Sequence, residues 1–166
     1  MLHVLATVCV IMLGLSRALS LSADQTRIVS YDEGRRLVWA RLYPHGGTTL
    51  YCGTPFTRRD ATLNVEHVYP ASWMTQALGC GSREQCRRTN RRFNRMEADL
   101  HNLHPDLQVT NQARSDYRFA LLPGETPTVL QTCDFEHDNE QQLAEPRPEV
   151  RGDIARALLY MEHEYV

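Results

Sequence analysis

The 166-residue chain contains no lysine, so all 18 of its basic residues are arginine. It has no C-x-x-C spacing among its five cysteines, which weakens the case for a structural zinc site. Its long apolar run, Val4 to Leu15, is too short to span a bilayer. No internal repeat or low-complexity segment occurs either. These absences argue against a membrane anchor, a zinc-stabilised module and a repeat protein, and they favour a single domain with a modest core.

The first twenty residues have the pattern of a secretory signal peptide. The apolar run is followed by Ala18-Leu19-Ser20, which offers small residues where a signal peptidase cuts. We expect cleavage after Ser20, although only His3 and no Lys or Arg precedes the run. The mature domain would then comprise residues 21–166, located in the periplasm or outside the cell.

Export to an oxidising compartment makes the remaining cysteines candidates for disulfides. Cys9 would leave with the signal, so four of the five cysteines stay, and four cysteines allow three pairings that the sequence does not decide between. A short glycine-containing loop separates Cys80 from Cys86 and looks like a local bridge. That pairing would leave Cys52 with Cys133.

Arginine is concentrated in one short segment. The net charge of −2 argues mildly against a nucleic-acid partner, yet the local field matters more for attracting a polyanion. Arginine suits bidentate phosphate contacts, although a charge run is most often only a solvated surface. Between positions 83 and 95 the sole acid is Glu84, and the arginines are Arg83, Arg87, Arg88, Arg91, Arg92 and Arg95.

Local patterns predict an α+β fold: a mainly helical single domain with a small β-sheet. Ser30 to Glu33 is a capping box that starts a helix, and Pro44 stops that helix. Residues 48–52 and 62–68 are typical of strands. The last helix, introduced by Pro146 and Pro148, keeps an apolar stripe as far as Tyr165 and is expected to serve packing.

Three further segments have less regular patterns. Residues 72–98 are expected to form a long connection with a short helix at 72–78, and such a connection is more often functional than idle. Residues 122–148, rich in Pro, Gly and acid, should be mostly loop. A helix at 107–120 would direct Tyr117 and Leu121 toward the core. By its spacing, one face of this helix would carry Asn111, Arg114, Ser115 and Arg118.

Glu66 and His67 stand side by side at the end of a predicted strand. In an unbroken strand they would point to opposite faces, so they serve one site only if the pleat breaks near Pro70. A hard cation such as Mg²⁺ prefers oxygen ligands, which Glu66 and the amide oxygen of Asn111 would supply. His67, with an ordinary pKa of about 6.5, would take a proton from an attacking water. Arg83 would hold the phosphate.

Each of these residues also has a structural interpretation. A Glu-His pair at a strand end is most often surface decoration, and an Asn near a helix start is usually a cap. His101 and His104 would join His67 in a zinc site if all three converged. His101 lies in a turn-like Asp-Leu-His-Asn segment, so a structural hydrogen bond explains it better.

Several stretches of the chain closely resemble the bacterial endonuclease I family. They are Val65 to Ala71, Cys86 to Asn94, Met96 to Leu103, Asn111 with Arg114-Ser115, and Glu145 to Arg156. The resemblance extends, with interruptions, from about Asp32 to the end of the chain. The family comprises periplasmic and secreted nonspecific nucleases built on a ββα-metal (His-Me finger) core, and the resemblance implies that core here.

The resemblance also implies roles for individual residues. Glu66 matches the metal-binding glutamate, His67 the general base, Asn111 the helix-borne metal ligand and Arg83 the arginine that binds the cleaved phosphate. The expected cofactor is Mg²⁺, one ion per site, with Mn²⁺ or Ca²⁺ as substitutes. Further nucleic-acid contacts are assigned to Arg87, Arg88, Arg91, Arg92, Arg114 and Arg118.

The implied reaction is hydrolysis of DNA, and commonly RNA, to 5′-phosphate ends. Contacts to phosphate and sugar rather than to base edges would explain weak sequence preference. We expect a monomer with no membrane-spanning segment in the mature form.

The chain departs from the family pattern in two places. Thr54 follows Tyr51-Cys52-Gly53 where members have a second cysteine, and the chain stops at Val166 where members continue into a Trp- and Asn-rich tail. It is therefore expected to be either a short member or a truncated one. Two other hypotheses stay open: a nucleic-acid-binding protein of the same fold that has lost catalysis, and a disulfide-stabilised binding module at the cell surface.

Overall fold

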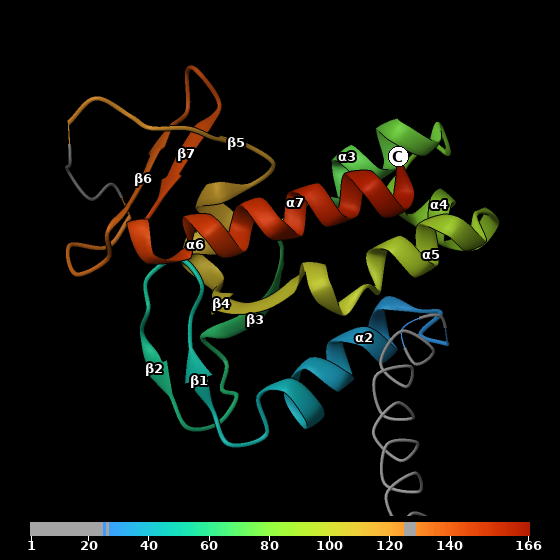
Figure 1. The fold of residues 1–166 in the computed structure, drawn as a ribbon, viewed down its shortest axis with the longest axis horizontal. Coiled ribbons are helices and arrows are strands. Elements are labelled where there is room, and N and C mark those ends of the chain that lie inside the picture. The colour runs from blue at the N-terminus through green and yellow to red at the C-terminus, as the bar shows by residue number, and fades with distance from the viewer. Residues whose placement is uncertain (1–24, 26, 125–128) are drawn as a thin grey trace, which may run out of the picture.

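The computed structural model describes residues 25, 27–124 and 129–166 (Figure 1). The predicted signal peptide, residues 1–20, lies outside the described residues. Within the described part of the chain, no helix is both long and apolar enough to cross a membrane.

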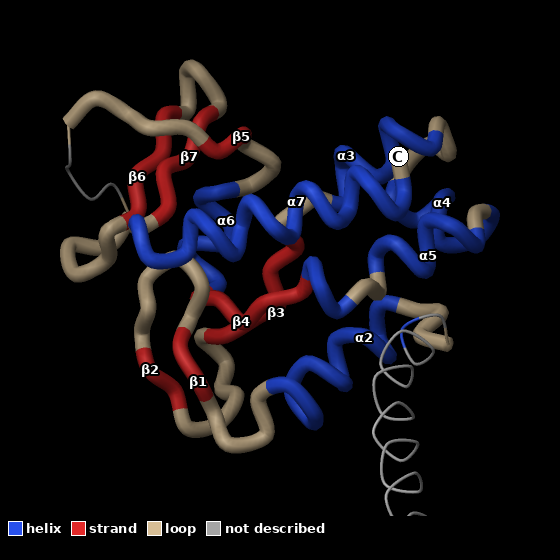
Figure 2. Tube along the Cα trace, viewed as in Figure 1, coloured by secondary structure: helices blue, strands red, loops and turns tan. Residues whose placement is uncertain are grey.

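Helices dominate the architecture, and short strands form small sheets among them (Figure 2). The α-helices are α2 (Tyr31–Leu37), α3 (Ala71–Leu78), α4 (Arg83–Thr89), α5 (Arg91–Glu97), α6 (Gln108–Arg114) and α7 (Arg151–Tyr165). A π-helical turn (Val38–Leu42) continues α2, and 3₁₀ turns occupy Leu100–Asn102 and Pro148–Val150. The strands are β1 (Gly47–Thr48), β2 (Pro55–Phe56), β3 (Leu63–His67), β4 (Leu103–Leu107), β5 (Arg118–Phe119), β6 (Phe135–Asp138) and β7 (Leu143–Pro146). This mixture is the α+β class that the sequence predicts.

The strands pair in three separate sheets. β1 pairs with β2, and β3 pairs with β4, in both cases antiparallel. In the third sheet β7 lies between β5, to which it is parallel, and β6, to which it is antiparallel. The β3–β4 register places Glu66 opposite His104 and His67 opposite Leu103.

Helix α7 crosses the middle of the molecule and connects its two ends (Figure 1). The three-stranded sheet lies at the N-terminal end of α7, whereas α3, α4 and α5 gather at the C-terminal end. Ile154 and Ala157 of α7 pack in a buried cluster with Phe135, and Met161 packs in another with Phe93. The predicted apolar stripe of the last helix therefore joins two parts of the core.

The long connection predicted at residues 72–98 is largely helical instead. Helix α3 confirms the short helix, but α4 and α5 follow it. The Ser82 side chain caps α4 by accepting from the backbone N–H of Gln85, whose side chain binds Ser82 N–H in return. The Asn90 side chain accepts from the N–H of Phe93 and caps α5. Each cap satisfies a free N–H group of its first turn, which helps to stabilise two short adjacent helices.

Three other predictions need correction. Of the strand expected at 48–52, only Thr48 belongs to a strand, β1, and β6 and β7 lie in a segment that was expected to be mostly loop. Helix α6 ends at Arg114 because Ser115 takes a φ of 53°, so the helix does not reach residue 120. Arg118 consequently belongs to β5 rather than to the predicted helix face. The side chain of Leu121 is exposed, not part of the core.

Both disulfides are those that the Cys80–Cys86 spacing favoured. Cys80 bonds Cys86 at a separation of 6 residues, and Cys52 bonds Cys133 at a separation of 81. Cys133 lies in the same buried cluster as Tyr51 and Phe135. The long-range bridge therefore ties the segment after β1 to the start of β6.

Removing the two bridges separately should lower stability unequally. A bridge contributes about 2 to 4 kcal/mol, and more when it closes a longer loop of the unfolded chain. We expect Cys52→Ser/Cys133→Ser to lower the melting temperature more than Cys80→Ser/Cys86→Ser, measured by thermal unfolding. An equal or larger loss for the local bridge would contradict the loop-length argument.

Candidate active site

Strand β3 and helix α6 bring the predicted metal ligands and base to one hollow. Strand β4 runs antiparallel to β3 and ends opposite Leu63, the start of β3. Helix α6 begins there and runs back along β3, with Asn111 beside Asn64 and Arg114 beside Glu66. The hollow has a volume of about 310 Å³. The predicted site residues that line it are Glu66, His67, Arg83, Arg87 and Asn111.

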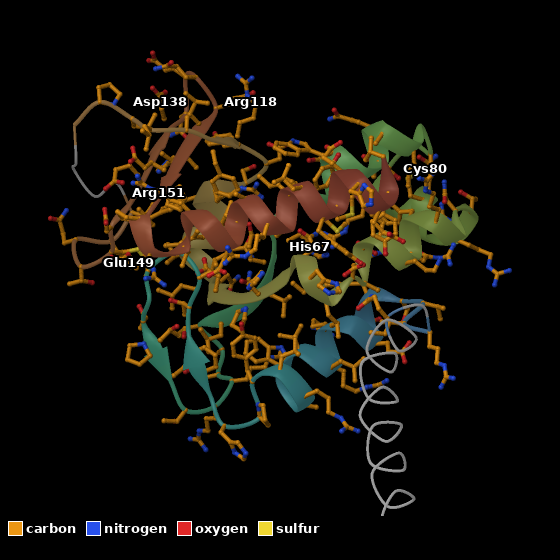
Figure 3. The ribbon with its side chains drawn as sticks, viewed as in Figure 1. His67, Cys80, Arg118, Asp138, Glu149 and Arg151 are labelled. Carbon is orange, nitrogen blue, oxygen red and sulfur yellow. A yellow bond between two sulfur atoms is a disulfide. The ribbon has the colours of Figure 1, made fainter. Side chains whose placement is uncertain are left out.

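Glu66 and His67 both line this hollow although they are neighbours in the chain. Strand β3 ends at His67, close to Pro70, so the alternation of a regular strand does not continue past the pair. Figure 3 shows His67 in the middle of the molecule, near the junction of several elements. Both residues still pair with β4, so the pleat does not break between them as the sequence analysis required.

The carboxylate of Glu66 is buried and held by two donors. Its Oε1 accepts from the Tyr51 hydroxyl at 2.5 Å and from Arg114 Nη1 at 3.1 Å. Burial raises the pKa of Glu66, while the Arg114 guanidinium and the Tyr51 hydroxyl oppose that rise. Burial also raises the pKa of Tyr51 well above its ordinary value, so this hydroxyl keeps its proton and donates.

Arg114 is fully buried beneath the site, with 0% of its surface exposed. Besides the ion pair with Glu66, its guanidinium donates to the backbone carbonyl of His67 at 3.1 Å and to that of Val68 at 2.7 Å. This position does not suit the nucleic-acid contact predicted from the helix face. Arg114 instead holds the end of β3 and the carboxylate of Glu66 in place.

One hydrogen bond orients the imidazole of His67. Its Nε2 lies 2.9 Å from the backbone carbonyl oxygen of Glu97, which can only accept, so Nε2 carries the hydrogen. In a neutral ring this leaves Nδ1 as the basic nitrogen. The Tyr31 ring packs against the imidazole with 4.9 Å between centroids. Burial, aided by the positive charge of Arg83, lowers the pKa of His67 to about 4, so the ring is neutral at pH 7.

Glu97 also anchors two arginines at the rim of the hollow. Its buried carboxylate accepts from Arg83 Nε at 2.5 Å and from Arg87 Nε and Nη2, each at 2.8 Å. Both guanidiniums lie over the Tyr31 ring, at 5.4 and 5.5 Å. Burial alone would raise the pKa of Glu97, but the hydrogen bonds from Arg87 and Arg83 hold it below its ordinary value. The Arg83 and Arg87 side chains stay 44% and 42% exposed, so both are accessible to a ligand.

Asn111 faces the hollow from the first turns of α6. Its Nδ2 donates to Asn64 Oδ1 at 2.9 Å, which leaves its own Oδ1 as the atom available to a cation. No group of three or more His, Cys, Asp or Glu residues suited to a metal occurs in the described part of the chain. One carboxylate and one amide oxygen fit Mg²⁺, which keeps most of its waters and takes few protein ligands.

The other predicted arginines do not line this hollow. Arg88 pairs with Glu84 on the exposed surface of α4, and Arg92 donates to the carbonyl of Tyr165 at 2.7 Å. Arg91 is exposed at the start of α5. Arg118 lines a different hollow beside β5 and β7. His101 bonds Asp99 at 2.8 Å, which confirms the structural role favoured for it.

Three site residues received no role from the sequence: Tyr31, Tyr51 and Glu97. Glu97 carried one signal, because it is the first acid after a run of arginines. Tyr31 and Tyr51 lie 36 and 15 residues from His67 and Glu66, and no local pattern links them. Only the folded chain brings these partners together.

Comparison with known proteins supports the family that the sequence suggests. The family model described as Endonuclease I matches residues 16–166. An extracellular deoxyribonuclease of Aeromonas hydrophila is 35% identical over 150 residues, covering 75% of this chain and 65% of the relative. A periplasmic deoxyribonuclease of that organism is 40% identical over 150 residues, covering 75% and 62%. Endonuclease-1 of Buchnera aphidicola subsp. Acyrthosiphon pisum is 27% identical over 157 residues, covering 90% and 61%.

The aligned region thus covers a little under two thirds of the length of these relatives. Two of them are named for locations outside the cytoplasm, extracellular and periplasmic, in agreement with the location predicted from the sequence. The match of the family model includes every residue that the structure describes. The chain belongs to the endonuclease I family.

Proposed function

We propose that this protein is a secreted or periplasmic endonuclease that hydrolyses phosphodiester bonds of DNA, and also of RNA, to 5′-phosphate ends. The observation that carries the proposal is the convergence of Glu66, His67, Arg83 and Asn111 on one hollow. These residues come from β3, α4 and α6, so chance clustering of sequence neighbours does not account for the set. Relatives named deoxyribonuclease support DNA as the substrate.

The order of elements around the hollow supports a ββα-metal core. Two antiparallel strands, β3 and β4, are followed at once by α6. The proposed base and one proposed ligand lie on the first strand, and the second ligand lies on the helix. A water and a phosphate would then bind in the space between strand and helix.

In this proposal His67 acts as the general base. The Glu97 carbonyl fixes the ring with hydrogen on Nε2, so Nδ1 receives the proton of the attacking water. A pKa below neutrality keeps Nδ1 unprotonated at pH 7. Arg83, held by Glu97, contacts the phosphate and offsets the negative charge that grows on it, with Arg87 beside it.

Glu66 and Asn111 would hold Mg²⁺ through their oxygens. When bound, the cation supplies Lewis-acid stabilisation of charge on the reacting phosphate and the leaving oxygen. Tyr51 and Arg114 keep the Glu66 carboxylate in position for that purpose. Contacts of this kind go to phosphate and not to base edges, which predicts cleavage with little sequence preference.

A plasmid-degradation assay tests the proposal directly. Purified protein should convert supercoiled plasmid to nicked and linear forms with Mg²⁺ and should stop when EDTA is added. Binding of DNA without any cleavage would favour the alternative of a catalytically impaired nucleic-acid-binding protein. If the protein neither binds nor cleaves DNA, the result would favour the third hypothesis, a disulfide-stabilised binding module.

Substitution of the proposed ligands should raise the Mg²⁺ concentration needed for activity. Asn111→Ala deletes one of few protein oxygens. Glu66→Gln is preferred to alanine because it keeps a side chain opposite the buried Arg114. Gln112→Ala, an exposed neighbour on α6, is the matched control. If Asn111→Ala and Glu66→Gln keep the Mg²⁺ dependence of the parent in a titration, the ligand assignment is wrong.

The exposed arginines of α4 and α5 should act on binding rather than on chemistry. Replacing Arg88, Arg91 and Arg92 with Gln should flatten the salt dependence of duplex binding by about 0.9 in logarithmic slope per lost phosphate contact. Replacing Arg36 and Arg156, which are also exposed, should leave the slope unchanged. The slopes can be measured by fluorescence anisotropy with a labelled duplex. If both sets of substitutions give the same slope, the arginines of α4 and α5 do not contact the nucleic acid and belong to the solvated surface.

A further inference from the structure

A second hollow has a volume of about 290 Å³. Its lining residues are Trp73, Gln76, Asp116, Arg118 and Gln142. They come from α3, the segment after α6, β5 and the turn before β7. The proposed hydrolysis uses none of them.

Two segments, α3 and the residues directly after α6, contribute to the lining of both hollows. On α3, Ala71 lines the first hollow and Trp73 the second; after α6, Ser115 lines the first and Asp116 the second. Between them the Ser72 hydroxyl donates to Asp116 Oδ2 at 2.9 Å. The buried guanidinium of Arg114 links the two hollows, because it bonds Glu66 of the first and lies 5.9 Å from the Trp73 ring of the second. A polymer in the first hollow would place its adjacent unit at the second.

Trp73 presents a fixed aromatic ring in this second hollow. It packs with the Tyr69 ring in a T-shaped arrangement, with 5.4 Å between centroids and an 88° angle between planes. The guanidinium of the buried Arg114 lies 5.9 Å from the same ring. A ring held by the core needs little ordering when a ligand stacks on it, and every nucleobase offers a face for stacking.

Arg118 adds a cation to the same hollow. Its side chain is exposed and forms no ion pair with any residue that the structure describes. The backbone N–H of Arg118 donates to the carbonyl of Gln142 at 3.1 Å, which fixes the position of β5 beside the turn before β7. Figure 3 shows Arg118 on the side of the three-stranded sheet, apart from His67. An exposed arginine whose charge is not paired with a carboxylate suits a phosphate group.

The remaining polar groups match a base edge better than a phosphate. The amides of Gln76 and Gln142 offer donors and acceptors, whereas the carboxylate of Asp116 accepts only and would repel a phosphate. A free base edge is available only when the base is unpaired. The non-glycine residues with positive φ in the described part of the chain are Ser115 (φ 53°), which lines the first hollow, and Gln142 (φ 55°), which lines the second.

We propose that this second hollow is a subsite for one unpaired nucleobase of the nucleotide adjacent to the cleavage position. Trp73 stacks on the base, Arg118 binds a phosphate beside it, and Asp116 with the two glutamines binds its edge. The inference rests on the proposed nuclease function and deepens it, since it assigns single-stranded segments as the preferred substrate class at this subsite. A base in a duplex is stacked and paired, and cannot enter.

Tryptophan fluorescence tests the subsite because the chain has only two tryptophans, Trp39 and Trp73. Trp39 packs near Phe56 and lines neither hollow. In Trp39→Phe/His67→Gln protein with EDTA, where cleavage is blocked, a short single-stranded oligonucleotide should quench the remaining fluorescence saturably. In Trp73→Phe/His67→Gln protein the fluorescence of Trp39 should stay constant. Binding detected by anisotropy without quenching of Trp73, or no binding at all, would overturn the subsite.

Binding measurements give a second test that leaves the core intact. Gln76→Glu adds a negative charge on the exposed side of α3, and Arg118→Gln removes the cation. Each should weaken binding of a single strand about tenfold while changing binding of a duplex of equal length less. Arg156→Gln is the control. An equal change for both substrates would reject the subsite.

These results are independent of the cleavage assay. Plasmid cleavage without quenching rejects the subsite and leaves the nuclease function standing. Quenching without cleavage supports the subsite and rejects the nuclease function.

Discussion

Replacing His67 with glutamine should lower the rate of phosphodiester cleavage by about 10²- to 10⁴-fold, the usual effect of losing a general base. Glutamine can still donate to the Glu97 carbonyl that now accepts from His67 Nε2, so the surrounding structure should persist. It offers no nitrogen that takes up a proton near pH 7. Initial rates of plasmid nicking at saturating Mg²⁺ measure the effect.

A matched control separates chemistry from folding. His163→Gln changes an exposed histidine near the end of α7 and should leave the rate unchanged. The His67→Gln protein should also bind DNA in EDTA with the affinity of the parent, since the proposed phosphate contacts belong to Arg83 and its neighbours. A folded His67→Gln protein with the parent's rate would remove His67 from the mechanism.

Replacing Arg114 with methionine should destabilise the protein by about 3 to 5 kcal/mol, because it leaves a buried carboxylate without its partner. Glu66 would lose the guanidinium that lies 3.1 Å from its Oε1, and the carbonyls of His67 and Val68 would lose their donors. Urea unfolding measures the change. Arg118→Met, at an exposed position, should stay within about 0.5 kcal/mol of the parent.

A double variant makes the cause of that loss testable. Arg114→Met/Glu66→Gln leaves no unpaired charge in the interior, so it should recover part of the stability lost by Arg114→Met alone. If the stability lost in the double variant equals the sum of the losses in the two single variants, the ion pair with Glu66 is not what Arg114 contributes to stability. The carbonyl contacts would then carry the effect.

Patterns within a few residues predicted the parts of the fold that depend on local physics. The Ser30 cap starts α2 by accepting from the N–H of Glu33, and the apolar stripe of the last helix is buried at Ile154, Ala157 and Met161. The Cys80–Cys86 spacing favoured the local bridge, and with it the long one. The caps at Ser82 and Asn90 carried equally local signals, and reading them would have revealed α4 and α5.

The candidate site also has a part that the sequence predicted and a part that it did not. Residue type and family resemblance singled out Glu66, His67, Arg83 and Asn111, and the structure brings these four to one hollow. Their mutual orientation was not predictable from spacing, because Glu66 and His67 would diverge in a continued strand. Both residues stay within β3, and contacts from other elements hold their side chains at the hollow: Tyr51 and Arg114 on Glu66, and Glu97 on His67.

Arg114 shows most clearly what the sequence by itself could not determine. On a helix continued to residue 120 it would face solvent beside Arg118, as the spacing predicts. In the folded chain α6 stops at Arg114, and its guanidinium turns inward to Glu66, 48 residues earlier. The pairing depends on the low exposure that β3 and α6 create together, and no pattern of neighbouring residues encodes that environment.

The sequence alone therefore indicated the family, through its resemblance, and with it the candidate base, ligands and phosphate-binding arginine, while the Cys80–Cys86 spacing favoured the disulfide pairing that the structure shows. Tertiary structure decided which groups hold them: Tyr51 and Arg114 on Glu66, and Glu97 on both His67 and Arg83. Those partners lie 14 to 48 residues apart along the chain. Hydrogen bonds and ion pairs across such separations form only after the apolar core has packed, because packing both brings the groups together and excludes the water that would otherwise satisfy them.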